Sequence, residues 1–288
     1  MFINRNSFLP AFTLFPLLYL LGILFSSFIT LVTGVRDADI SSLIVTSFVF
    51  LTFLFLLPIW VKLRWGNKLP WKALGLAIET KAKSLRLFMR GFCIGLSLIC
   101  ILLLFVLSGG WINDVQSVSL QTLTNAVLLV FLVGIAEELI FRGWLFTEMV
   151  HLFGVQFGFI LQAIIFSLVH LKIYNNFFSS VFLSIGLFLL GLLLAYRRIL
   201  DKGSLWGCIG LHGSLVGIWF VIDSGFVIFS SDIPTFLIGL HNSNPNPISG
   251  IISIVILSII CYSQKSTFSR MRRFFAGTLS ASSSEELP

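Results

Sequence analysis

The sequence predicts an all-α fold, a polytopic membrane helix bundle with about eight transmembrane helices. Two features of its composition lead to this prediction: 57% of the 288 residues are hydrophobic and 11% are charged, whereas about 25% of the residues of soluble domains are charged. A third is that the apolar residues form runs of roughly 20, the length that crosses a bilayer. The mean hydropathy of +1.01 argues against a soluble protein of ordinary composition.

Eight runs of the sequence qualify as spans. The first follows a short positive segment at Arg5 and exceeds the core of a cleaved secretory signal, which has about 7–15 residues, so we expect it to be retained. The fifth is short, and the seventh is rich in glycine. The predicted spans are residues 8–33, 41–61, 86–107, 122–147, 155–171, 178–197, 204–223 and 248–264.

The basic residues indicate how the bundle is oriented. They concentrate in residues 62–90, in the connection after the sixth span at Arg197 and Arg198, and in the tail after the eighth span. With eight spans, all of these fall on the same side as Arg5, and the positive-inside rule makes that side cytoplasmic. Because these residues flank spans and form no basic domain of their own, we expect membrane lipid and no nucleic acid as partner. Short loops and the lack of an organelle address predict a multi-pass protein of the bacterial cell membrane, with both termini cytoplasmic.

We expect four segments along the chain. The first holds three helices and the basic cytoplasmic loop 62–90, and the second holds helices four to seven with the candidate functional core. The third is an outer loop with the last helix, and the fourth is a basic and then disordered tail. Their ranges are residues 1–120, 121–225, 226–265 and 266–288.

Ionisable residues at membrane depth are few, and because charges are costly there, each is a functional hypothesis by default. Glu138 and Arg142 are four positions apart, which is about 40° around a helix, so we expect them to pair as a scaffold. Glu137 points about 100° away from Glu138. It has no cation three or four positions away in its helix, so its partner must come from another helix. The ionisable residues at this depth are Glu137, Glu138, Arg142, His170 and His212.

The fifth span offers a partner for Glu137. In "LQAIIFSLVHL", Phe166 and His170 lie one helical turn apart. If spans four and five form an antiparallel hairpin that turns near Gly154, the acidic pair lies level with His170, and Arg142 lies level with Phe166. The sequence therefore predicts that Glu137 and His170 face each other.

The seventh span, "SLWGCIGLHGSLVGIWF", carries a glycine flank and a histidine. The glycines share one side of the helix, which permits close contact with other helices. His212 points about 100° or more away from the middle of that flank, so we expect it to face another neighbour. The glycines of the flank are Gly207, Gly210, Gly213 and Gly217.

A carboxylate and two histidines support two ways of activating water. In the first, Glu137 is a general base assisted by His170, and His212 donates a hydrogen bond to the oxyanion. This scheme needs no cofactor. In the second, the same three side chains bind a metal ion that activates the water. The helix-borne zinc motif HExxH is absent, yet zinc remains an alternative because converging helices can also supply its ligands.

Three motifs of this chain resemble those of one family. "EELIFR" resembles the EExxxR motif of the CPBP family, the CAAX-protease and bacteriocin-processing membrane enzymes, also called the Abi or type II CAAX prenyl endopeptidase family. "FSLVH" is similar to its second motif, FxxxH. "GLHGSLV" is similar to its third, a histidine followed four residues later by Asn or Asp. The resemblance covers about residues 125–220 and implies an eight-helix intramembrane glutamic endopeptidase that cleaves a peptide or membrane-associated protein.

The resemblance also implies a role for each matched residue. Glu137 would activate water together with His170, and His212 would help to stabilise the oxyanion. The other matched residues would support or line the site: Glu138, Arg142 and Phe166.

One position departs from the family pattern. Val216 stands where the third motif commonly has Asn or Asp, and its side chain cannot form a hydrogen bond. Either another donor substitutes, such as Ser214 or a backbone N–H, or the activity is weak or absent. A non-enzymatic role as a bacteriocin-immunity, tolerance or membrane-scaffold protein therefore stays open. A transporter with a proton relay is a third reading, which the lack of an internal repeat disfavours.

Overall fold

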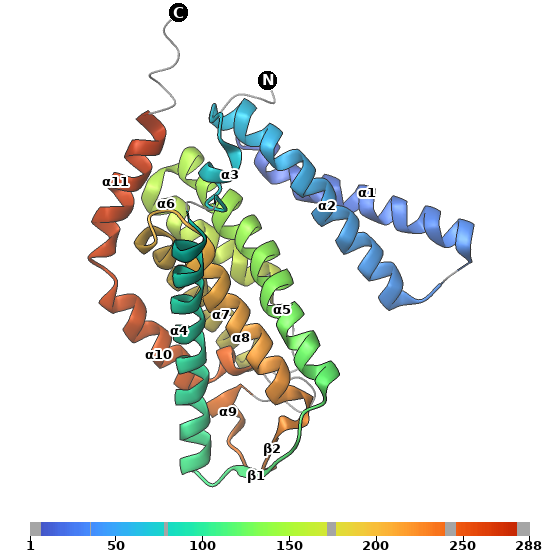
Figure 1. The fold of residues 1–288 in the computed structure, drawn as a ribbon, viewed down its shortest axis with the longest axis vertical. Coiled ribbons are helices and arrows are strands. Elements are labelled where there is room, and N and C mark those ends of the chain that lie inside the picture. The colour runs from blue at the N-terminus through green and yellow to red at the C-terminus, as the bar shows by residue number, and fades with distance from the viewer. Residues whose placement is uncertain (1–6, 35, 78–79, 172–176, 240–245, 281–288) are drawn as a thin grey trace, which may run out of the picture. The chain divides into compact units, whose positions relative to one another are not determined.

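A computed structural model describes residues 7–34, 36–77, 80–171, 177–239 and 246–280. It confirms the prediction of an all-α bundle (Figure 1). In the described residues, 6 helical stretches are long and apolar enough to cross a membrane, or 7 if the bent pair at the end of the chain forms one span. One stretch, Leu120–Val169, contains the fourth predicted span and all but the last two residues of the fifth. The protein is therefore an integral, multi-pass membrane protein, and eight spans is an approximate count.

The chain divides into two compact units, residues 1–73 with 279–288, and residues 74–278. The helices and strands of the first are α1 (Leu9–Thr33), α2 (Ala38–Trp65) and α3 (Pro70–Ala73). Those that follow are α4 (Lys81–Ser108), β1 (Ile112–Val115), α5 (Leu120–Glu138), η1 (Leu139–Leu145), α6 (Phe146–Val169), α7 (Phe177–Leu200), α8 (Trp206–Val221), η2 (Ile222–Phe226), β2 (Val227–Phe229), α9 (Thr235–Ile238), η3 (Pro247–Ser249), α10 (Ile251–Ser263) and α11 (Thr267–Ser280).

The first unit is a hairpin of α1 and α2. Asp37 caps α2 by accepting a hydrogen bond from the backbone N–H of Ile40 at 2.9 Å, which satisfies one of the free donors at the start of the helix. The rings of Phe25 and Phe48 stack across the hairpin with their centroids 4.7 Å apart. These contacts hold the two long apolar helices side by side.

In the second unit, α8 packs closely against α4 and α5 (Figure 1). The glycines of α8 allow this, as predicted. A Cβ at Gly210 would collide with the backbone of Phe88 in α4, and one at Gly213 would collide with the carbonyl of Val130 in α5. Because backbones meet backbones at these points, α8 is held in a fixed position beside both helices.

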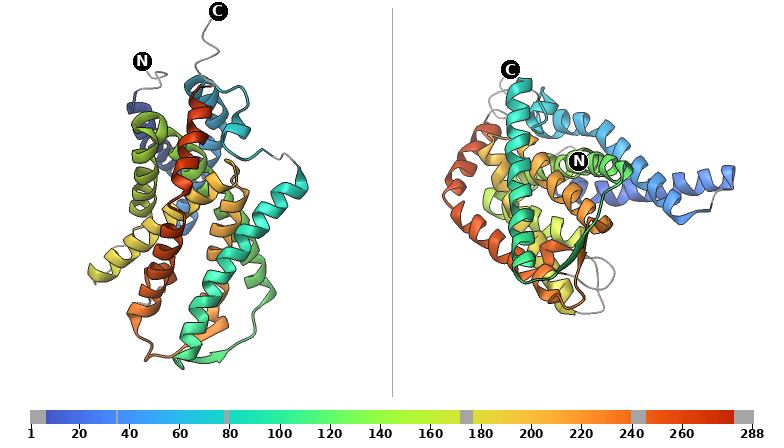
Figure 2. Two further views of the ribbon diagram at one scale, coloured as in Figure 1. Left: turned by 90° about the vertical axis from the view of Figure 1, so that its left-hand side faces the viewer. Right: turned by 60° about the horizontal axis from the view of Figure 1, so that its bottom comes forward.

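A short antiparallel ribbon of β1 and β2 ties the end of α4 to the segment that follows α8 (Figure 2). Val115 pairs with Val227, and Ile112 pairs with Phe229. The indole of Trp219 in α8 stacks on Phe229 with the ring centroids 6.4 Å apart. The ribbon therefore holds the end of α4 beside the end of α8.

The chain reverses direction at Gly154, inside the residues of α6. Gly154 has φ 77° and ψ 170°, a backbone conformation that breaks the helix and that glycine adopts without a steric penalty. On the two sides of this break, Phe146 packs against Phe159 and Phe141 against Phe166, with ring centroids 6.3 Å and 5.0 Å apart. The prediction of an antiparallel hairpin that turns near Gly154 is thus confirmed.

Candidate active site

Glu137 and His170 are in direct contact. Glu137 lies next to the end of α5 and His170 follows α6, so the reversal at Gly154 brings the two level. Oε2 of Glu137 is 3.0 Å from Nε2 of His170. The two side chains are 27% and 29% exposed, which leaves both accessible to a bound molecule. The prediction that Glu137 finds its partner on the neighbouring helix is confirmed.

The other nitrogen of His170 determines how many protons this pair holds. Nδ1 lies 2.8 Å from the carbonyl oxygen of Phe166, and because a carbonyl only accepts, Nδ1 must carry a hydrogen. A single proton is then shared between Nε2 of His170 and Oε2 of Glu137. The pair is either a carboxylate beside an imidazolium or a carboxylic acid beside a neutral imidazole. Such a pair can accept one proton and release another, as general acid–base catalysis requires.

Glu138 lies beside the pair but is fully buried, at 0% exposure. Its Oε1 accepts a hydrogen bond from Nη1 of Arg142 at 3.0 Å, so the predicted pairing of Glu138 with Arg142 is confirmed. The same oxygen accepts a second hydrogen bond, from Nδ1 of His212 at 2.8 Å. Glu138 therefore joins the scaffold pair to the third motif, a contact that the sequence did not reveal.

This contact also orients His212. Because Nδ1 donates to Glu138, Nε2 is the nitrogen that faces Glu137, 3.8 Å from its Oε2. With Nδ1 protonated, Nε2 carries a hydrogen only when the whole ring is an imidazolium. To donate from Nε2 to an oxyanion, His212 would therefore have to carry a hydrogen on both ring nitrogens.

The residues after Glu138 form a π-helix, η1, in which the backbone N–H of Phe146 bonds to the carbonyl of Phe141, five residues earlier. π-turns often mark functional sites. Arg198 of α7 donates from Nη1 to the carbonyl oxygen of Arg142 and, at 2.9 Å, to Oγ1 of Thr147. Although the sequence placed Arg198 among the cytoplasmic loop charges, it is 1% exposed, and it clamps the π-turn that carries the scaffold.

Phe166 contacts both Arg142 and the two histidines. The guanidinium carbon of Arg142 lies 4.2 Å from the centroid of the Phe166 ring, a favourable cation–π distance. The same ring has its centroid 4.5 Å from the His170 ring and 5.8 Å from the His212 ring. Its predicted place beside the site is confirmed by these contacts.

A cavity of about 370 Å³ opens onto these residues. It is lined mainly by apolar side chains, with a few polar groups, as is usual for ligand sites. Val216 lines it one helical turn beyond His212. Its lining comes from α4 (Ile99), α5 (Leu129, Val133, Glu137), α6 and its end (Phe166, His170), α7 (Leu187, Leu190), α8 and η2 (His212, Leu215, Val216, Trp219, Phe220, Asp223), and η3 with the residue before it (Asn246, Pro247, Ile248).

Ser214 does not serve the cavity. Its hydroxyl donates to the carbonyl oxygen of Leu211 at 2.9 Å, and it lies against Gly95 of α4, where a Cβ would collide with it. Of the alternatives raised by Val216, replacement of the donor by Ser214 is therefore not supported, because this face of α8 is the one that packs on α4. Two polar residues that do line the cavity, Asp223 and Asn246, were missed: neither lies in a motif, and Asp223 is the last residue of the seventh predicted span.

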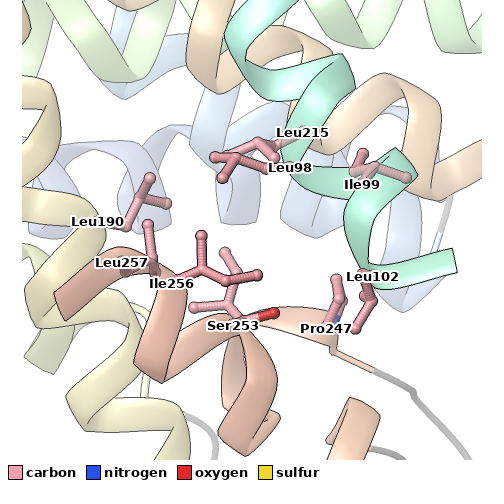
Figure 3. Close-up of a pocket in the computed structure, with 10 residues that line it drawn as sticks. Leu98, Ile99, Leu102, Leu190, Leu215, Pro247, Ser253, Ile256 and Leu257 are labelled. Carbon is pink, nitrogen blue, oxygen red and sulfur yellow. The ribbon is translucent and has the colours of Figure 1, made fainter. Parts of the chain in front are cut away.

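An apolar recess of about 40 Å³ adjoins the cavity (Figure 3). The two share the lining residues Ile99, Leu190, Leu215, Pro247 and Ile248. The remaining walls of the recess come from α4 and from α10: Leu98, Leu102, Ser253, Ile256 and Leu257. The recess is therefore a side chamber of the site, of a size and polarity suited to an aliphatic group.

Within the described part of the chain, no group of three or more His, Cys, Asp and Glu side chains has an arrangement that could hold a metal ion. Two hydrogen bonds join the acids and histidines at the cavity, one between His170 and Glu137 and one between His212 and Glu138.

Comparison with known proteins identifies two segments. Residues 119–218 match the family model of the Rce1-like type II CAAX prenyl endopeptidases, and residues 1–69 match a domain of unknown function, DUF8676. No curated protein and no solved structure matches the chain. The first match contains all three motifs and confirms the resemblance read from them. The second falls within the α1–α2 unit.

Proposed function

We propose that this chain is an intramembrane endopeptidase, of the CAAX-protease type that its central segment matches, and that it hydrolyses a peptide bond of a membrane-associated protein or peptide. The observation that carries the proposal is the 3.0 Å contact between Glu137 Oε2 and His170 Nε2, at the edge of a cavity large enough for a segment of polypeptide. The family match makes a protease-type hydrolase the expected class.

In the first step, the carboxylate of Glu137 takes a proton from a water molecule, whose oxygen attacks the carbonyl carbon of the peptide bond. The carbonyl π-bond opens and its electron pair becomes an oxyanion. His170 orients the carboxylate through the shared proton and balances its charge. His212, as an imidazolium held by Glu138, donates from Nε2 to the oxyanion.

In the second step, the oxyanion re-forms the carbonyl and the C–N bond breaks. The leaving nitrogen takes a proton from the Glu137–His170 pair, which now holds two. The products are a carboxylic acid and an amine, and the pair returns to one proton. Atoms and charges balance without a further reactant, so the chain's own side chains suffice for this route.

The direct test is proteolysis by the purified protein in detergent. A library of peptides prepared from a bacterial membrane proteome would be incubated with the protein, and new termini would be identified by mass spectrometry. We expect cleavage by the wild type and none by Glu137→Gln or His170→Ala. The matched control is Asp114→Asn, which alters an exposed carboxylate in β1 and should leave cleavage unchanged. Full cleavage by Glu137→Gln would refute the assignment.

A second function is favoured by Val216, which brings no hydrogen-bonding group to the cavity. In this alternative the chain keeps the fold of the family but is catalytically weak or inactive, and acts as a bacteriocin-immunity or membrane-scaffold protein. Protection of cells, or retention of a partner, would then survive Glu137→Gln. Glu137→Gln therefore distinguishes the two functions: it should abolish cleavage if the chain is a peptidase, and leave protection or partner retention intact if the chain is not.

The setting of the site is also part of the proposal. The excess of Lys and Arg in residues 62–90 and in the tail supports cytoplasmic termini by the positive-inside rule. Short loops support a bacterial cell membrane. Reporter fusions at residue 114 and at the C-terminus should report opposite sides of the membrane. Fusions that report the same side would contradict this orientation.

A further inference from the structure

Asn246 is a polar residue of the cavity that lies outside the three motifs. It precedes η3, the short turn that leads into α10, and lines the cavity together with Pro247 and Ile248. On α8, the position one turn beyond His212 is Val216, which offers no hydrogen bond. A hydrogen-bond donor on another wall of the cavity could take the place of one at position 216.

Local hydrogen bonds determine which end of the Asn246 amide is available. Its Oδ1 accepts from the backbone N–H of Ile248 at 3.1 Å, and because that N–H can only donate, the oxygen and not the nitrogen must face it. The backbone carbonyl accepts from the N–H and the hydroxyl of Ser249 at 3.0 Å and 2.8 Å. Among the described residues, Nδ2 has no hydrogen-bond partner. Its two hydrogens remain for a ligand.

Packing against α7 places the η3 turn level with Glu137 and His170. The carbonyl of Ile248 lies against Gly186, where any Cβ would collide with it. Two residues before Gly186, the carbonyl of Ser184 accepts from Oγ of Ser167 at 2.8 Å. Ser167 precedes His170 by three residues, less than one helical turn. The η3 turn therefore lines the cavity at the depth of His170, on the α7 side of it.

We infer that Asn246 Nδ2 donates a hydrogen bond to a carbonyl oxygen of the peptide bound in this cavity. This is the kind of contact that a polar side chain at position 216 would make from α8. The inference rests on the proposed function for the class of ligand, a peptide. It assigns Asn246 as a substrate-contacting residue supplied by the turn before α10.

Three variants test the assignment through kcat/KM on a peptide that the wild type cleaves. Asn246→Asp keeps the oxygen that accepts from Ile248 but removes the donor, and Asn246→Ala removes both. We expect each to lower kcat/KM by about 10²-fold, the lower end of the range for loss of one such donor. Adding Val216→Asn to Asn246→Ala should recover at least about tenfold, because it returns a donor to the cavity from α8.

Retained activity decides against the inference. If Asn246→Asp cleaves as fast as the wild type while Asn246→Ala is impaired, the residue only caps the η3 turn. If both variants match the wild type, Asn246 has no role in turnover. Thermal unfolding in detergent controls for folding, and an Asn246→Asp protein that unfolds at the wild-type temperature makes its kinetic loss specific.

A binding measurement separates this inference from the proposed function. The probe is the peptide aldehyde benzyloxycarbonyl-Leu-Leu-leucinal, titrated into Glu137→Gln and into Glu137→Gln/Asn246→Asp. We expect the Kd to rise by about five- to tenfold in the double variant, as for one lost hydrogen bond. A higher Kd in the double variant, together with no hydrolysis by the wild type, would support the contact of Asn246 with the peptide and refute the proposed peptidase activity. Equal affinities with hydrolysis intact would do the reverse, and a protein that neither binds the probe nor cleaves peptides overturns both.

Discussion

Nδ1 of His212 lies 2.8 Å from Oε1 of Glu138, the same oxygen that Arg142 Nη1 approaches to 3.0 Å. This shared oxygen distinguishes Glu138 from its neighbour Glu137. Glu138 is buried and saturated with donors on one side, whereas Glu137 is accessible and paired with His170. The two carboxylates, adjacent in sequence, should therefore respond very differently to the same substitution.

The first prediction concerns the stability of these two acids. Glu138→Gln removes a buried charge and leaves the guanidinium of Arg142 without its counterion, which we expect to cost about 3–5 kcal/mol and to lower the thermal midpoint by roughly 10 °C. Glu137→Gln, the matched control, changes a partly exposed carboxylate and should shift the midpoint far less. Thermal unfolding of both variants in the same detergent measures the difference. Equal midpoints would contradict the scaffold role of Glu138.

The second prediction concerns Arg198, which clamps the carbonyl oxygen of Arg142 in the π-turn. Arg198→Met keeps the bulk of the side chain but removes these donors, so we expect a loss of about 1–3 kcal/mol together with reduced peptide cleavage. Arg86→Met is the control, because Arg86 is exposed on α4 and such changes stay within about 0.5 kcal/mol. Unfolding midpoints and cleavage rates are compared. An Arg198→Met protein that behaves like the control would show that the clamp is dispensable.

The third prediction concerns the apolar recess beside the cavity. Ser253→Phe adds an aromatic ring where the recess opens between α4 and α10, so peptides that place a large aliphatic side chain there should lose about 10- to 200-fold in kcat/KM. Val255→Phe lies two positions along the same helix on its exposed face and serves as the control. The measurement is the change in cleaved sequences across a peptide library. An unchanged sequence profile for Ser253→Phe would mean that the recess does not select substrates.

The fourth prediction separates the two schemes for activating water. If the Glu137–His170 pair acts alone, cleavage should persist at the same rate after incubation with EDTA or 1,10-phenanthroline. Metal analysis of the active preparation should find less than one equivalent of zinc per chain. Inactivation by both chelators, reversed by added zinc, would instead establish the metal route.

Much of the fold could be predicted from the sequence because the bilayer imposes a simple rule. Runs of about 20 apolar residues must become helices, and this rule located most of the long helices to within a few residues, although α6 begins at Phe146, before the predicted start at residue 155. The hairpin followed from one glycine: Gly154 breaks the helix, and counting outward from it placed the acidic pair, Glu137 and Glu138, level with His170. The ion pair of Glu138 and Arg142 followed from helix periodicity alone.

The remaining features of the site depend on contacts between segments that are distant in the sequence. The bond from His212 to Glu138 requires α8 to be rotated by its packing against α4 and α5, which periodicity within α8 cannot reveal. Arg198 looked like a loop charge because it lies at the basic end of a span. Asn246 lies just before a three-residue turn with no hydropathy signal, and only the cavity lining identified it.

The π-turn after Glu138 fixes the rotation of the helix before it relative to the helix after it. Before the turn, Glu137 lines the cavity and Glu138 is buried beside it; after the turn, Phe146 and Val150 join the core cluster with Phe159 and α11. A continuous α-helix lacking one residue would rotate one face against the other by about 100°. The acids and the aromatic anchor could then not both be in place, so the length of this segment is fixed to the single residue.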